Sequence, residues 1–78
     1  MITLRSNKDL LIELRNKVSY RIIECKANIA YFQVVLRKLK NVSQEMVDGR
    51  KAIKTNEESI KKDEVFLRCI DLMIQKEE

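Results

Sequence analysis

Apolar residues recur with a helical spacing along the first half of the chain. From Leu11 onward they follow one another at steps of three or four residues, and the two steps alternate without error from Ile22 to Leu39. This alternation places side chains on one face of a helix and is typical of a coiled-coil seam. The seam consists of Leu11, Leu14, Val18, Ile22, Cys25, Ile29, Phe32, Leu36 and Leu39. It predicts a long helix that packs against another helix.

A second apolar stripe lies on the opposite side of this predicted helix. Eight of the ten residues from Ala27 to Leu36 are apolar, with neither proline nor glycine among them. A surface helix normally shows one apolar stripe, whereas a helix that is apolar all round is buried on several sides. The second stripe runs through Tyr20, Ile23, Ala27, Ala30 or Tyr31, and Val34. Because one stripe serves one contact, we expect a second packing partner on another protein chain.

Ser6 marks the expected start of the first helix, at about residue 7. Asp9 follows it by three residues, as in a capping box with Asp in place of Glu, and an apolar run begins at Leu10. The chain contains no proline and a single glycine, so it holds few residues that break a helix. These features predict an all-α protein built from long helices.

Two places compete for the turn that reverses the chain. A turn near Gly49 uses the left-handed conformation that glycine adopts after helix ends, and gives helices of about 7–47 and 51–76. The alternative is a turn at 41–43, which follows a basic segment suited to a helix C-terminus. We favour Gly49, because that turn sets the apolar end of the second helix against the most apolar part of the first.

The predicted fold is all-α, a long antiparallel helical hairpin resembling a coiled coil, in one domain over residues 1–78. Domains of this size bury only about 60% of the surface of the unfolded chain, so they need extra support. Two cysteines and no histidine provide neither a zinc site nor a disulfide scaffold. We therefore expect self-association or a partner protein to complete a bundle of three or four helices.

A turn near Gly49 leaves the beginning of the longer first helix uncovered by the second helix. The expected partner interface combines apolar side chains from that overhang with two from the second stripe. It consists of Leu11, Leu14, Val18, Tyr31 and Val34. The expected core consists of Ile22, Ile29, Phe32, Val35, Leu36, Phe66 and Ile70. Burial of one such side chain contributes about 1.5–3 kcal/mol, so a few of them suffice for specific association.

Charge is divided unevenly along the chain. Residues 1–41 hold nine Lys or Arg and three Asp or Glu, whereas residues 42–78 hold seven and nine. We interpret this division as a basic helix lying beside an acidic one. The turn near Gly49 also gathers basic residues at the hairpin tip, namely Arg37, Lys38, Lys40, Arg50, Lys51 and Lys54. They are the expected contacts if the protein binds nucleic acid or an acidic partner.

RNA or DNA binding is the main alternative function. Its layout is similar to that of the plasmid-copy-control hairpin dimers, which bind paired RNA loops, and the basic first helix would neutralise phosphates. Tyr31 and Phe32 lie within the apolar run instead of between basic residues, so no platform for stacking bases is present. Nucleic acid is therefore the less favoured partner.

Two short segments, 11–15 and 42–46, resemble the small helical-hairpin aspartyl-phosphate phosphatases of sporulating bacteria. That family carries a Ser-Gln-x-Leu-Asp signature, with the Asp four residues after the Ser. Here Val47 occupies the place of the Asp, and Asp48 comes one residue later. One residue is a rotation of about 100° on a helix, which turns the carboxylate off the required face. A phosphatase is the remote alternative.

The sequence thus predicts a non-enzymatic protein–protein interaction module, such as an adaptor, an assembly or secretion chaperone, or an inhibitor. Its expected partner is another protein, a second copy, or both. Cys25 and Cys69 lie on apolar faces and are expected to pack as small apolar side chains. We expect no cofactor and no membrane span, since no run of about 18 apolar residues exists. Reduced cysteines and a first segment without an apolar signal core favour the cytoplasm.

Overall fold

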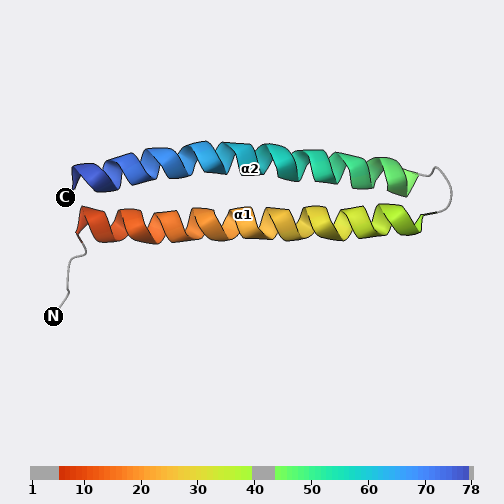
Figure 1. Ribbon diagram of the computed structural model, residues 1–78, viewed down its shortest axis with the longest axis horizontal. Coiled ribbons are helices and arrows are strands. Elements are labelled where there is room, and N and C mark those ends of the chain that lie inside the picture. Colours follow the sequence, from red (N-terminus) through yellow and green to blue (C-terminus); the bar gives the residue numbers. More distant parts are fainter. Residues whose placement is uncertain (1–5, 40–43, 78) are drawn as a thin grey trace.

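The protein is a hairpin of two long helices. The computed structural model describes residues 6–39 and 44–77, and these parts contain helix α1, Asn7–Lys38, and helix α2, Gln44–Lys76. The helices run antiparallel and side by side along their whole length (Figure 1). No strand occurs in either described part. The predicted all-α hairpin is confirmed.

The start of α1 follows the capping signal in the sequence. Ser6 is extended, and its Oγ accepts a hydrogen bond of 3.1 Å from the backbone N–H of Asp9. This bond satisfies one of the backbone donors that the first turn leaves without a partner. At the other end Arg37 and Lys38 occupy the last turn, where positive charge interacts favourably with the helix dipole.

The turn predicted near Gly49 is wrong, because Gly49 lies inside α2 with no positive φ. It is buried, and a Cβ placed on it would lie 3.0 Å from Cδ2 of Leu36 on α1. The missing side chain therefore lets the helices approach closely instead of reversing the chain. The reversal takes place between Leu39 and Gln44. The alternative turn at 41–43 falls within residues 40–43, outside the described residues.

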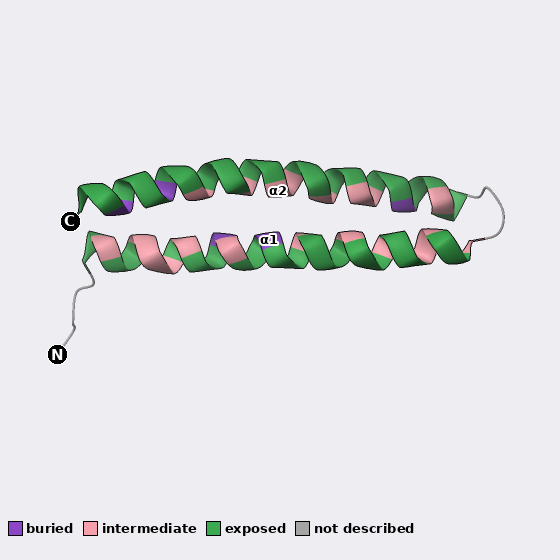
Figure 2. Cartoon of the chain, in the orientation of Figure 1, coloured by how far each residue is buried: buried purple, intermediate pink, exposed green. Residues whose placement is uncertain are grey.

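The core lies along the facing sides of the two helices, where the buried and half-buried residues gather (Figure 2). Val18 and Ile70 are almost fully buried, at 0% and 1% exposure, and Ile74 joins them in one cluster. Leu11, Ile12 and Leu67 pack against this cluster. The predicted seam of the first helix is therefore the side that meets α2.

Most of the predicted core residues lie on this contact, but one does not. Ile22 and Ile70 are buried. The half-buried members are Ile29, Phe32, Val35 and Leu36. Phe66 is 42% exposed, so its assignment to the core is wrong. It lies beside the seam of α2, which runs through Leu67, Ile70 and Ile74.

Polar contacts fix how the two helices lie against each other. Arg21 Nη2 lies 3.0 Å from Oδ1 of Asp63, and Arg15 Nη1 lies 3.6 Å from Oδ1 of Asp71. Both pairs join a basic residue of α1 to an acidic residue of α2. The prediction of an acidic second helix is wrong, because Gln44–Lys76 holds seven Lys or Arg and seven Asp or Glu, and two of the nine acidic residues of 42–78 follow Lys76. Exposed ion pairs contribute only about 0–1 kcal/mol each, so these contacts set orientation more than stability.

The close approach at Gly49 predicts how substitutions there change stability. Gly49→Ala gains about 1 kcal/mol of helix propensity, which offsets the small shift required of the Leu36 side chain. Gly49→Leu has similar propensity but overfills the contact, and we expect it to lower the free energy of unfolding by about 1–3 kcal/mol. Urea unfolding followed by circular dichroism measures both variants. A Gly49→Leu protein as stable as the unmodified one would show that the helices are not in close contact here.

Candidate protein interface

The hairpin exposes more large apolar side chains than it buries. Among the described residues, four apolar side chains are buried and eleven large ones are exposed. The exposed ones are Leu10, Leu14, Tyr20, Ile23, Tyr31, Val34, Val47, Val65, Phe66, Leu72 and Met73. Single exposed apolar residues are ordinary on a monomer, whereas a contiguous patch marks an interaction site. The arrangement of these eleven residues is therefore the relevant geometry.

One patch follows the side of α1 that faces away from α2. Tyr20, Ile23, Ala27, Tyr31 and Val34 stand at steps of three or four and are all exposed; we call them the outer stripe of α1. The two tyrosines and Ile23 are each more than 60% exposed. The stripe covers fourteen residue steps, which is about 21 Å along a helix. Apolar surface of this length matches about four turns of a partner helix.

Tyr31 and Val34, two of the five predicted partner contacts, lie on this stripe. The Tyr31 ring stands edge-on to the ring of Phe32, with 5.3 Å between the centroids and 73° between the planes. Phe32 is itself half-buried on the α2 side. An edge-to-face contact of this kind orients the exposed tyrosine ring.

The other three predicted contacts lie on the α2 side of α1. Val18 is fully buried in the core, Leu11 packs against the same cluster, and Leu14 is 38% exposed at its edge. They were selected because the beginning of the first helix was expected to extend beyond the second helix. That prediction is wrong, because α2 covers the beginning of α1 (Figure 1). The reason is the turn: with the reversal before Gln44 instead of near Gly49, the two arms are almost equal in length.

A patch on α2 was not predicted as an interface. Val65, Phe66, Cys69, Leu72 and Met73 are all exposed, and Cys69 stands three or four residues from each of the other four; we call them the outer stripe of α2. Cys69 is thus exposed, contrary to the expectation of core packing, whereas Cys25 is half-buried. The signal in the sequence was the run of apolar residues from 65 onward, which is too continuous for a single face.

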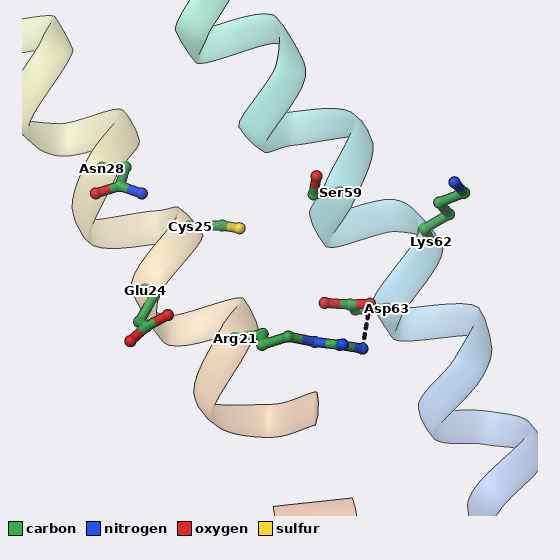
Figure 3. A pocket seen from close by; sticks show the side chains of 7 residues that line it. All are labelled: Arg21, Glu24, Cys25, Asn28, Ser59, Lys62 and Asp63. Atoms are coloured by element: carbon green, nitrogen blue, oxygen red, sulfur yellow. Dashed lines mark hydrogen bonds and ion pairs between the residues drawn. The ribbon is translucent and has the colours of Figure 1, made fainter. Parts of the chain in front are cut away.

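The groove between the helices is hollowed on one side. Its middle hollow is lined by Arg21, Glu24, Cys25, Asn28, Ser59, Lys62 and Asp63 (Figure 3). Arg21 reaches across it to Asp63, while Glu24 points away from that pair. A second hollow of about 470 Å³ lies nearer the hairpin tip, lined by Tyr31, Phe32, Val35, Glu45, Asp48, Gly49 and Ala52. We call the side that carries both hollows the grooved face.

The basic residues near the tip do not share one face. Arg37 and Lys38 end α1, and Arg50, Lys51 and Lys54 follow within the first three turns of α2, all of them exposed. Neighbours on a helix point about 100° apart, so these cations spread around both helices. Lys40 lies outside the described residues.

Asp48, the residue that bears on the phosphatase resemblance, is exposed near the start of α2. Its Oδ1 accepts a hydrogen bond of 2.9 Å from Nε2 of Gln44, one turn earlier. In the described part of the chain, no three carboxylate or thiol side chains gather as they would around a metal ion. Of the two segments that carry the resemblance, residues 11–15 lie in α1 and residues 42 and 43 lie outside the described residues.

Comparisons with protein families, with curated proteins and with solved structures find no match for this chain. Over residues 6–39 and 44–77, neither helix holds a stretch apolar enough to cross a bilayer.

The helix register predicts that Cys25 and Cys69 cannot pair within one chain. Cys25 lies beside Ser59, and Cys69 stands ten residues further along α2, about 15 Å away. A disulfide requires Cα atoms within about 7 Å of each other. After mild oxidation, we expect mass spectrometry of digested monomer to find no peptide that joins the two cysteines. Such a peptide in good yield would contradict the register.

Proposed function

We propose that this protein binds another protein through the outer stripe of α1 and does not catalyse a reaction. The observation that supports this most directly is the imbalance between eleven exposed and four buried apolar side chains in the described residues. Water contact with so much apolar surface is unfavourable, and a partner helix that covers it removes the cost.

The stripe contains enough apolar surface for specific binding. Tyr20, Ile23, Tyr31 and Val34 would together contribute about 6–12 kcal/mol if fully buried, before the costs of association. An affinity of about 1 μM corresponds to about 8 kcal/mol. The fitting partner is an amphipathic helix whose apolar residues repeat at steps of three and four.

Adaptors, assembly or secretion chaperones and inhibitors share this mechanism, since each covers an apolar face of its partner. We place the protein in the cytoplasm, where an exposed thiol such as that of Cys69 stays reduced. The spread of the basic residues around the hairpin tip gives nucleic-acid binding no comparable support.

Ile23→Glu tests the proposal, because it places a charge in the middle of the stripe on an exposed residue outside the core. Unmodified protein immobilised on a resin is used to capture partners from the source cells, and each captured protein is then purified and titrated. We expect Ile23→Glu to weaken binding by about 100-fold or more, since a buried unpaired charge is costly. Circular dichroism checks that the helices are unchanged.

Lys26→Glu is the matched control, since it introduces the same side chain three residues away at an exposed polar position. It should bind as the unmodified protein does. Equal binding by Ile23→Glu would rule out the stripe. Loss of binding in both variants, or capture of nucleic acid that is released by high salt, would favour the charged surfaces instead.

A further inference from the structure

A row of side chains on α1 has apolar residues at both ends. Leu10 and Leu14 lie at the base of the hairpin, and Tyr31 and Val35 lie near the tip. The residues between them continue the same steps of four and three, so the whole row follows one side of the helix. Tyr31 and Val35 line the tip hollow, which places this row on the grooved face.

The middle of the row is polar, and its positions are spaced symmetrically about a point between Arg21 and Glu24. Lys17 and Asn28 come next inward, and Arg21 and Glu24 form the centre. If a second copy lies antiparallel on the row with Leu14 opposite Tyr31, then Arg21 of each copy lies opposite Glu24 of the other. In a two-fold contact every pairing occurs twice, once from each copy, so the pair of Arg21 and Glu24 would form at two places.

The α2 side of the grooved face has a matching pattern. Ala52 lines the tip hollow beside Gly49, and Phe66 lines a hollow with Arg21 near the middle. Met73 lies two turns beyond Phe66 toward the base and is exposed. Small residues at the tip thus leave space, and large apolar residues project nearer the base. An antiparallel second copy would place Met73 near Ala52 of the first copy, at the tip hollow.

We infer that a second copy of this chain docks on the grooved face, antiparallel, with the tip of each hairpin over the base of the other. The two-fold axis passes beside Arg21 and Glu24 on α1 and beside Lys62 and Asp63 on α2. Lys62 lies level with its own counterpart there, and the adjacent Asp63 of each copy supplies the opposite charge. The Arg21 guanidinium has donors for Glu24 of the other copy in addition to its bond with Asp63. This row shares Tyr31 with the outer stripe of α1 and otherwise uses different residues, so the inference goes beyond the proposed function.

The exposed area of the single hairpin supports a second copy of this size. The chain exposes 6576 Å², whereas a compact monomer of 9.2 kDa exposes about 4,900 Å². The excess of about 1,700 Å² exceeds the roughly 800 Å² that a standard interface removes from each partner, so one docked copy would account for about half of it. The hairpin is also a single layer, 15 Å in its shortest dimension. A docked copy supplies the second layer that domains use to enclose a core.

The solution mass tests whether the dimer exists and which charges hold it. Light scattering should give about 18 kDa, twice the 9.2 kDa of one chain. Glu24→Arg places like charges opposite each other and should raise the dimer dissociation constant about tenfold or more. Arg21→Glu and Glu24→Arg, combined with Asp63→Lys to keep the pair between positions 21 and 63 within each chain, restore opposite charges across the contact and should restore the dimer. Glu57→Arg, on an exposed residue outside the grooved face, is the control with the same change in net charge.

A disulfide tests the antiparallel arrangement. Arg21 lies beside Asp63 and Asn28 beside Asn56, so the midpoint between Arg21 and Glu24 lies level with residue 62 on α2. Thr55 and Cys69 stand seven residues on either side of it and are therefore opposite each other across the dimer. Within one helix they are about 21 Å apart, too far for a disulfide. Thr55→Cys in a Cys25→Ser background should form a covalent dimer on oxidation.

Each outcome decides between the arrangement and its rivals. A mass of 9.2 kDa at high concentration overturns the inference. If the covalent dimer still forms when Cys69→Ser is added, the disulfide has joined position 55 of one copy to position 55 of the other. That result overturns the antiparallel register. Ile23→Glu should leave the mass unchanged; if it dissociates the dimer, the outer stripe of α1 is the self-association surface instead. Loss of partner binding with an intact dimer supports both proposals separately.

Discussion

The contact between the two helices is centred on a buried cluster of Val18, Ile70 and Ile74. This contact covers only one side of each helix, and that limit determines what the rest of the surface exposes. Two helices share a single line of contact, so each buries one face and leaves the others in water. In this chain the apolar residues are not confined to that one face. The hairpin therefore leaves the apolar residues of its other faces exposed to water.

The surface is organised in a way that separates two kinds of contact. The outer stripe of α1 is a continuous apolar line that fits a helix of any protein with complementary spacing. The grooved face instead combines apolar ends with a charged centre, and such mixed surfaces select a partner more by matching charge than by area. A protein that associates with itself on one face and with another protein on a second can present its binding stripe twice. Two linked sites raise the effective affinity for a partner that is itself repeated.

Much of this architecture was predictable because local signals agreed. The Ser6 cap and the alternating steps through Ile22 and Ile29 each depend on a few neighbouring residues, and both were predicted correctly. Gly49 was misassigned because a missing Cβ serves two purposes, a left-handed helix end or a close helix contact, and the sequence is the same for both. Distinguishing them requires knowing that Leu36 lies opposite.

The error at Gly49 then passed to the interface. A turn placed several residues too late makes the first helix longer than the second. The prediction therefore assigned Val18, which is buried in the core, to the partner interface. Phe66 was misplaced for a related reason. In the apolar segment that begins at Val65, only the register with α1 decides which residues face inward, and that register depends on where the chain reverses. Long-range pairing is the part of the fold that periodicity leaves undetermined.

An exposed amide pair joins the two helices beside the seam. Asn28 Nδ2 donates to Oδ1 of Asn56 at 3.3 Å, and Asn56 Nδ2 donates to the backbone oxygen of Ala52 at 2.7 Å. A seam with a seven-residue repeat tolerates sliding by one heptad, because apolar side chains then meet apolar side chains again. Sliding here would separate the two amides and bring Leu36 against Asn56. The hydrogen bond between the asparagines therefore favours the observed register of the two helices. The same register places Gly49 beside Leu36.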